Sequence, residues 1–187
     1  MIGAAFPAVL AAAARGDEDA LATLWRDLQP RLLRYLTVLA QGAAEDLASD
    51  TWLAVIRGIG RFQGDEPGFR TWVFTIARHQ VIDGRRRSAR RKAEGLPAAG
   101  LADRPAPDDP AAAALEGIST RAALALIATL PADQAEAIVL RVVAGLDVAR
   151  VAAIMGKRPG AVRVLTHRGL RRLAERVGAG ARVHGGV

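Results

Sequence analysis

The chain of 187 residues has no cysteine, which excludes disulfide bridges and thiolate metal sites. Aromatic residues make up only 4% of it, and runs of β-branched residues are scarce, so a sheet-rich fold is not favoured. No stretch approaches the roughly 18–20 apolar residues that a transmembrane helix needs. Residues 1–14 are apolar but lack a basic leader, so we expect no secretory signal. Ala, Leu, Arg and Glu dominate instead, which predicts an all-α protein.

Motifs of catalytic chemistry are also missing. The histidines, His79, His167 and His184, are far apart and show no metal-ligand spacing. There is no G-x-S-x-G nucleophile motif and no glycine-rich phosphate loop. We therefore expect neither an enzyme nor a metal or other cofactor.

Positive charge is concentrated in two places. Residues 78–92 hold seven basic residues and one acidic residue, and residues 157–182 hold eight and one. The net charge of the whole chain is only +7, so the remainder of the sequence is acidic. This pattern is typical of a protein that contacts a polyanion, above all nucleic acid, through two separate elements. Two solvated helix faces are the alternative.

An acidic linker is expected between the two basic clusters. Residues 93–117 contain four prolines, three glycines and a net charge of −4. Such a composition favours a flexible connection over a packed element. It divides the chain into an N-terminal helical domain, 1–92, and a C-terminal helical domain, 118–187.

The N-terminal domain is predicted to be helical throughout. Asp17 and Asp19 lie at an expected helix start, where a carboxylate can cap exposed N–H groups, and Trp25 falls among the apolar positions that follow. Pro30 predicts a break or a new first turn. A further helix is expected over 44–62, followed by a loop at 63–68 and a last helix from about Phe69.

The helix over 44–62 has two contrasting sides. Leu47, Trp52 and Val55 fall on one side, which we expect to face the core. Spacings of three and four place a second set together on the opposite side. Taken alone, that side also fits an ordinary solvated face. Its members are Asp46, Ser49, Asp50, Leu53 and Arg57.

The last helix of this domain combines aromatic and basic residues. Trp72 and Phe74 precede the arginine-rich run 85–92. Aromatic rings beside cations suit the binding of unstacked bases. Both rings equally fit a hydrophobic core.

The C-terminal domain has the pattern of a helix-turn-helix. Ser119 or Thr120 is a candidate cap for its first helix. Further on, Asp147 is expected to cap a short helix that ends at Gly156, and a second helix is expected to begin at Pro159 or Gly160. That helix presents Arg163, His167, Arg168 and Arg171 on one broad face, while Val162, Thr166, Gly169 and Leu173 can pack inward. Arginines on such a face can contact guanine edges or phosphates, although a hairpin with a basic face is the alternative.

Several strings of this chain together resemble one known family. They are A-E-D-L-A-S-D-T-W-L-A-V at Ala44–Val55, F-R-T-W-V-F-T-I-A-R at Phe69–Arg78, V-I-D-G-R-R-R at Val81–Arg87, L-P-A-D-Q-A-E-A-I-V-L-R at Leu130–Arg141, and G-A-V-R-V-L-T-H-R-G-L-R-R-L at Gly160–Leu173. Their order and the acidic linker resemble the sigma factors of the extracytoplasmic-function class, in the sigma-70 family. The resemblance covers the chain from about Ala14 to Ala174.

The resemblance implies a role for each domain in transcription initiation. The first domain would bind core RNA polymerase through Asp46, Ser49, Asp50, Leu53 and Arg57. With the 63–68 loop and the following helix, it would also melt and read the minus-ten promoter element. The residues implied in that readout are Arg70, Trp72, Arg78, His79, Arg85, Arg86 and Arg87. The second domain would read the minus-thirty-five element through Arg158, Arg163, Val164, His167, Arg168 and Arg171.

The implied partners are core RNA polymerase, double-stranded promoter DNA and its melted non-template strand. An anti-sigma factor is a further partner that the resemblance allows, and membrane insertion is not expected. The protein would be a non-catalytic initiation subunit in the bacterial cytoplasm, associated with the nucleoid through polymerase. The sequence departs from the family pattern at His79, where asparagine is usual, and at Val164 and Leu165, where polar or basic residues are common. A stand-alone helix-turn-helix regulator is the rival hypothesis.

Overall fold

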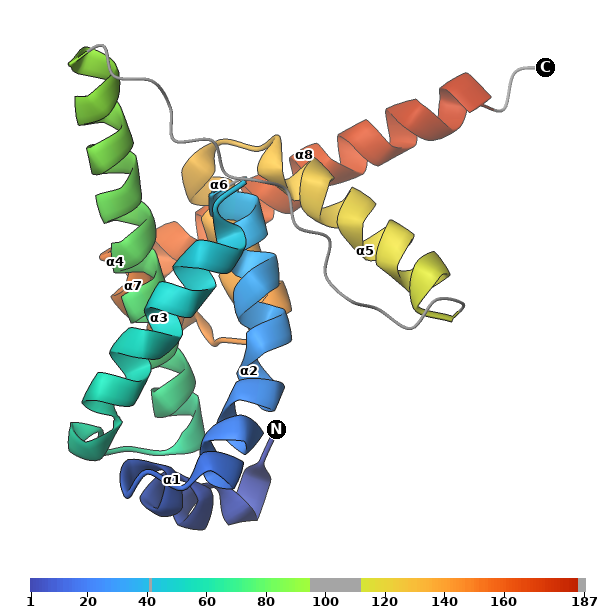
Figure 1. Cartoon of the computed structure of the whole chain (residues 1–187). Helices are drawn as coiled ribbons and strands as arrows, with labels where there is room; N and C mark the ends of the chain where they lie inside the picture. The colour runs from blue at the N-terminus through green and yellow to red at the C-terminus, as the bar shows by residue number, and fades with distance from the viewer. Residues whose placement is uncertain (41, 95–111, 185–187) are drawn as a thin grey trace. The chain divides into compact units, whose positions relative to one another are not determined.

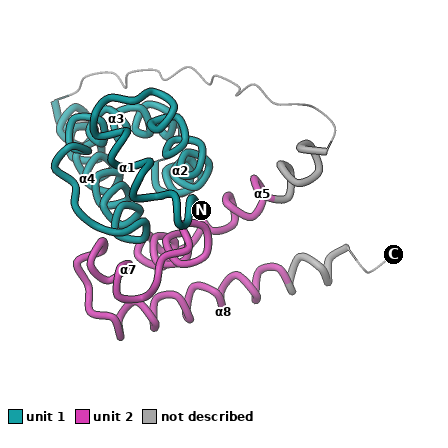
Figure 2. Tube along the Cα trace, turned by 90° about the horizontal axis from the view of Figure 1, so that it is seen from below, with its two compact units in different colours: residues 1–102 teal, residues 103–187 magenta. Residues whose placement is uncertain are grey.

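The chain folds into two compact units of helices. The computed structural model describes residues 1–40, 42–94 and 112–184, and every regular element among them is helical (Figure 1). This confirms the predicted all-α class. Unit 1 spans Met1–Ala102 and unit 2 spans Asp103–Val187 (Figure 2). The boundary falls within the predicted linker, of which residues 95–111 lie outside the described residues.

Unit 1 is built from α1 (Phe6–Ala14), α2 (Glu18–Leu39), α3 (Ala44–Gly58) and α4 (Glu66–Ala93). Short 3₁₀ turns precede α1 and follow α3, at Gly3–Ala5 and Ile59–Arg61. Helices α2, α3 and α4 pack against one another, and α1 covers one end by packing on α2. Their core contains side chains with almost no exposure, listed here by helix: Leu24, Leu32 and Leu36 of α2, Val55 of α3, and Phe69, Val73 and Phe74 of α4.

Helix α2 begins as predicted but does not break where the sequence suggested. The carboxylate of Asp17 accepts a hydrogen bond from the backbone N–H of Ala20 at 2.8 Å, which confirms the cap. The helix then continues through Pro30, so the predicted break is wrong. Interior proline costs about 3 kcal/mol. The buried leucines on both sides of it, spaced four apart, outweigh that cost at roughly 1.5–3 kcal/mol each.

Helix α4 begins earlier than the sequence suggested. Asp65 accepts a hydrogen bond from the backbone N–H of Gly68 at 2.7 Å and so caps the helix, which starts at Glu66 rather than near Phe69. Pro67 occupies the first turn, where its missing N–H costs nothing. The loop between α3 and α4 is therefore shorter than the predicted 63–68 segment.

Unit 2 contains α5 (Ala112–Ala128), α6 (Ala132–Ile138), a π-helical turn (Val139–Val143), α7 (Val148–Met155) and α8 (Pro159–His184). Helix α5 begins upstream of the caps predicted at Ser119 or Thr120. Asp147 caps α7 as predicted, by accepting from the backbone N–H of Arg150 at 2.9 Å. Gly156 ends α7 in the left-handed conformation, with φ at +63°.

Helix α8 packs closely against α6 and α7. A side chain at Gly169 would place its Cβ 2.6 Å from Cδ1 of Ile138 and 3.3 Å from Cβ of Gln134, so glycine permits the close approach of α8 to α6. Arg172 donates to Gln134 Oε1 at 3.1 Å across the same contact. Together α6, α7 and α8 hold the helix-turn-helix in one rigid arrangement.

Candidate functional site

The predicted surface of α3 is exposed along its full length. Asp46, Ser49, Asp50, Leu53 and Arg57 all lie at the surface, while the opposite side of the helix is buried. Leu53 is 50% exposed, which is unusual for a large apolar side chain on a helix with a well-formed core side. The acidic residues lie toward the amino end of α3 and Arg57 lies in its last turn, so each charge also suits the helix dipole.

The structure adds two apolar residues to this surface. Ile56 of α3 is 50% exposed, and Trp25 of α2, which the sequence placed among the apolar positions of its helix, is 47% exposed. Nε1 of Trp52 donates to Oε1 of Gln29 at 2.7 Å, which fixes the pairing of α3 with α2. Trp25 lies one turn before Gln29 and Ile56 one turn after Trp52, so both follow the seam between these helices. We call Leu53, Ile56 and Trp25 the apolar strip.

An aromatic cluster surrounds the short connection between α3 and α4. Phe62 stacks on Trp72, with ring centroids 5.2 Å apart and ring planes 27° apart, and Phe69 packs against both rings. Trp72 remains half-buried, whereas Phe74 is fully buried with its ring at 5.3 Å from Tyr35. Thus Phe74 belongs to the core. Beside the stack lies an open hollow of about 320 Å³, lined by Gly58, Arg61, Phe62, Gln63 and Trp72.

The carboxyl-terminal part of α4 carries the first basic cluster. It extends past the ends of α2 and α3 (Figure 1). His79, Arg86 and Arg87 are exposed, and Arg78 is half-buried. Arg86 pairs with Asp83, one turn earlier in the same helix, at 3.8 Å between exposed side chains, and such a pair costs little to exchange for another anion. This end of α4 is a projecting positive surface.

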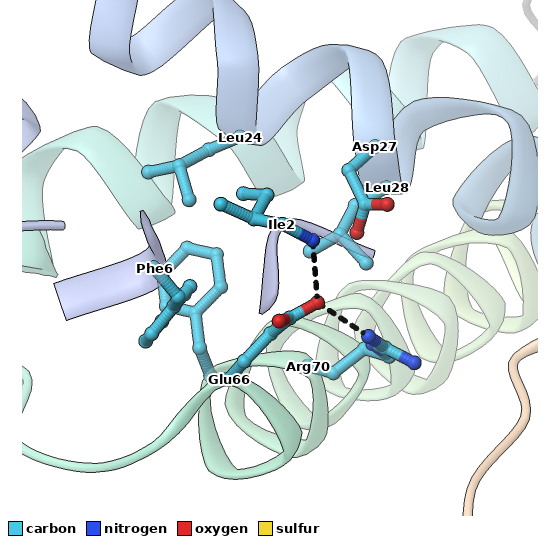
Figure 3. Close-up of a pocket in the computed structure, with 8 residues that line it drawn as sticks. Ile2, Phe6, Leu24, Asp27, Leu28, Glu66 and Arg70 are labelled. Carbon is cyan, nitrogen blue, oxygen red and sulfur yellow. Dashed lines mark hydrogen bonds and ion pairs between the residues drawn. The ribbon is translucent and has the colours of Figure 1, made fainter. Parts of the chain in front are cut away.

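Arg70 does not share that surface, which corrects the prediction from the sequence. Its side chain is 7% exposed and forms an ion pair with Glu66 at 2.8 Å. The Glu66 carboxylate also accepts hydrogen bonds from the backbone N–H groups of Ile2 and Gly3, at 3.1 and 2.8 Å. In Figure 3 the carboxylate lies between Ile2 and the Arg70 guanidinium. Glu66 therefore joins α4 to the N-terminal segment, and Arg70 neutralises its carboxylate.

Arg85 also differs from its neighbours in the basic cluster. Its side chain reaches back from α4 and donates to the backbone carbonyl of Leu39, at the end of α2, at 2.7 Å. The sequence grouped Arg85 with Arg86 and Arg87 because the three are consecutive. Only the packing of α4 against the end of α2 distinguishes Arg85 from the other two.

The second basic cluster occupies the outward face of α8. Val162 and Gly169 are buried against the rest of unit 2, and Leu165, Thr166 and Leu173 are half-buried, as the periodicity predicts. The opposite face is exposed at each position that the sequence proposed for DNA contact. Those positions are Arg158, Arg163, Val164, His167, Arg168 and Arg171. Arg171 pairs with Glu175 at 3.0 Å, one turn further along the helix.

The turn between α7 and the exposed face of α8 is held by a helix cap and an ion pair. Backbone N–H groups of α7 and the Arg150 side chain hold the pKa of Asp147 below its ordinary value of 3.8, with the N–H of Arg150 as the largest cause. Lys157, in the turn itself, pairs with Asp133 of α6 at 2.9 Å. The amino end of α8 is thus held in place before any ligand binds.

Comparison with known families identifies both units. Residues 24–91 match the model of Sigma-70 region 2, and residues 120–173 match that of Sigma-70 region 4. The ECF RNA polymerase sigma factor SigD of Mycobacterium tuberculosis is 36% identical over 184 residues, which cover 95% of this chain and 86% of SigD. The chain belongs to the sigma-70 family, in its extracytoplasmic-function class. ShbA, an ECF sigma factor of Streptomyces griseus, is 36% identical over 172 residues, covering 86% of this chain and 89% of ShbA.

Solved structures agree with this assignment. The sigma factor RpoE in complex with the anti-sigma factor NepR from Bartonella quintana matches with a TM-score of 0.60 and 26% identity, over 83% of this chain and 97% of that one. CnrH in complex with the cytosolic domain of CnrY has the same fold, with a TM-score of 0.63 and 21% identity, over 91% of this chain and 96% of the other.

Membership of the family establishes the function. The protein is an alternative sigma factor that directs RNA polymerase to promoters, with core RNA polymerase and promoter DNA as its partners. A stand-alone helix-turn-helix regulator is not favoured, because such a protein would have no use for region 2. Among the described residues, no helix combines the length and the apolar content needed to cross a bilayer.

Proposed function

We propose that this sigma factor divides initiation among three surfaces. The outward side of α3 and the apolar strip bind core polymerase, the aromatic hollow and the projecting end of α4 engage the minus-ten element, and α8 enters the major groove at the minus-thirty-five element. The chain does so by binding alone, as a non-catalytic subunit working in the cytoplasm. Two structural relatives were solved in complexes, CnrH with the cytosolic domain of CnrY and RpoE with the anti-sigma factor NepR, which makes an anti-sigma factor a candidate third partner.

The polymerase surface is supported by its mixed character. Apolar side chains that are half exposed on a folded monomer mark an interaction site, and tryptophan is enriched among the residues that dominate binding energy. The apolar strip supplies such side chains from two helices. Asp46 and Asp50 border it, so the surface suits a helical partner with basic residues around an apolar centre.

The minus-ten proposal rests on the stacked pair Phe62 and Trp72. An aromatic ring presents a face to any base, and stacking contributes about 1–3 kcal/mol per base. The adjacent hollow, at about 320 Å³, is large enough for a base that has left the duplex. Arg61 and Gln63 line it and can donate hydrogen bonds to base edges. Binding a base in this way stabilises melted DNA, which is how the sigma factor would assist strand opening.

The minus-thirty-five proposal rests on the exposed face of α8. Arg163 and Arg168 are fully at the surface while Val162, on the other side, is buried, so α8 offers one side to DNA without unfolding. Val164 is 47% exposed on the DNA side and can contact the methyl group of thymine. A helix of this kind is readily accommodated by the major groove.

The observation that carries the polymerase assignment is the exposed acidic side of α3, and charge reversal tests it. Asp46→Arg combined with Asp50→Arg should weaken binding to core polymerase at least tenfold, because two attractive charges become repulsive. Asp19→Arg is a matched control, since Asp19 is an exposed acid in the first turn of α2 and bears the same relation to a helix dipole as Asp46. Equal polymerase affinity in the double variant and the control would refute the assignment.

A further inference from the structure

Three features meet where α4 passes the corner between α2 and α3. A side chain at Gly84 would have its Cβ 4.0 Å from Cδ2 of Leu47, so α4 runs in van der Waals contact with the first turns of α3. At the next position, a guanidinium nitrogen of Arg85 donates to the Leu39 carbonyl at 2.7 Å. Beyond this point, α4 extends past the ends of α2 and α3, and its described side chains are exposed (Figure 1). Among the described residues, Arg85 is therefore the last point at which α4 is tied to the other helices of unit 1.

The end of α2 needs a partner of this kind. The last carbonyls of a helix have no partner within it, and the dipole makes this end negative. Helix α2 has 22 residues but no basic residue in its last turn. Its closing residue, Ala40, donates its N–H to Leu36, and Ala40 is not in the left-handed conformation. A cation supplied from α4 satisfies both the hydrogen-bonding and the electrostatic requirement.

The position of this contact connects two of the proposed surfaces. The corner from Leu39 to Ala44 leads directly into α3 and its polymerase-binding side. The α4 segment after Arg85 carries Arg86 and Arg87 toward DNA. The contact fixes the α4 segment after Arg85 relative to the corner that precedes α3. It therefore sets the direction in which the basic end of α4 projects when α3 is bound to polymerase.

We propose that Arg85 is a positioning residue and not a DNA contact: from α4 it caps the carboxyl end of α2 and fixes the basic end of α4 against the corner that precedes α3. The second part of this proposal rests on the proposed function, because it assumes that α3 binds polymerase and that the end of α4 binds DNA. The capping itself does not.

The test compares Arg85→Met with Arg86→Met and Arg85→Lys in the full chain. Methionine keeps the length and helix propensity but removes the donor and the charge. All three tryptophans lie in unit 1, so their fluorescence reports the unfolding of that unit. We expect Arg85→Met to lower its Tm by about 5 °C, Arg85→Lys to restore most of that loss, and Arg86→Met to leave it unchanged.

The DNA measurement is the salt dependence of promoter binding by the reconstituted holoenzyme. Losing one phosphate contact reduces the slope of log K against log salt by about 0.9. We expect that change for Arg86→Met and no change for Arg85→Met. At a temperature where the Arg85→Met variant is fully folded, its holoenzyme should still form open complexes several-fold more slowly than the wild-type holoenzyme. The Arg85→Lys holoenzyme should form them at close to the wild-type rate.

The outcomes separate the possibilities. A reduced slope with an unchanged Tm in Arg85→Met would make Arg85 a DNA contact and overturn the proposal. An unchanged Tm and unchanged opening would overturn it as well, since the contact would then have no consequence. A lowered Tm with normal opening would retain the cap and refute the positioning role. If instead the end of α4 does not bind DNA, Arg86→Met will leave the salt slope unchanged, and the proposed function fails for that surface.

Discussion

The close approach of α8 to α6 can be tested at Gly169. In an exposed helix, replacing glycine with alanine stabilises by about 1 kcal/mol. At Gly169 the added Cβ would lie 2.6 Å from Cδ1 of Ile138 and 3.3 Å from Cβ of Gln134. Ile138 is 1% exposed, so its terminal methyl group can move only against other buried side chains and not into solvent. Overpacking of this kind costs about 1–3 kcal/mol, which offsets or exceeds the gain in helix propensity.

Gly160 provides the matched control. It lies in the same helix, and a Cβ there meets no atom within 4 Å. We therefore expect Gly160→Ala to stabilise unit 2 slightly and Gly169→Ala to be less stable than Gly160→Ala by about 1–3 kcal/mol. Displacement of α8 from α6 should also weaken use of the minus-thirty-five element.

Denaturation followed by circular dichroism measures this difference. Tryptophan fluorescence is the internal reference, because the tryptophans lie in unit 1 and should unfold at the same denaturant concentration in both variants. If the two alanine variants raise the stability of unit 2 equally, α8 does not pack on α6 through Gly169 as described.

Three further predictions concern single side chains. Asp147→Ala should lower the stability of unit 2 by about 0.5–2 kcal/mol, because it removes the α7 cap. Folding lowers the pKa of Asp147, so the stability that this carboxylate contributes is present above pH 3.8 and is lost as the pH falls through the pKa of the folded state. An acid titration of unit 2 followed by circular dichroism measures this loss. Gly58→Ala should displace Trp72, whose Cζ2 would lie 2.9 Å from the new Cβ, and so shift tryptophan emission and slow promoter opening. Arg168→Ala should weaken binding by about 1–3 kcal/mol at one promoter position if it reads a base, or uniformly across promoter sequences with a smaller salt slope if it contacts phosphate, as a promoter library would show.

Local chemistry explains which structural features could be predicted. Asp17, Asp147 and Gly156 act within a few residues of their own positions, and the sequence identified all three. The exposed sides of α3 and α8 were also predicted, since helical periodicity alone separates Leu53 from Val55. The features that depended only on neighbouring residues were therefore found.

Two of the proposed DNA-contact residues take part in contacts that join distant parts of the chain. Arg70 is buried because Glu66 is held by the backbone of Ile2 and Gly3, and Arg85 differs from Arg86 because Leu39 lies beside it. Neither contact leaves a pattern in the local sequence. Trp25 lies at the edge of the leucine stripe of α2, about 100° around the helix from Leu24 and about 60° from Leu28, so periodicity alone did not decide its exposure.

The two basic clusters have different surroundings in the structure. In the first, Arg85 contacts the Leu39 carbonyl and Arg86 and Arg87 are exposed, and the cluster lies at the opposite end of α4 from the aromatic hollow suited to unstacked bases. The second lies on one face of a rigid helix-turn-helix suited to duplex DNA. Their different settings fit a protein that holds melted DNA with one unit and double-stranded DNA with the other.

The most direct test that this chain acts as a sigma factor is transcription in vitro from a promoter library, with the full chain and core RNA polymerase. Specific start sites are expected when both are present and none with core polymerase alone. The chain without polymerase should bind duplex DNA weakly and without sequence preference. Tight, sequence-specific DNA binding by the chain alone, with no polymerase-dependent transcripts, would contradict a function as a sigma factor.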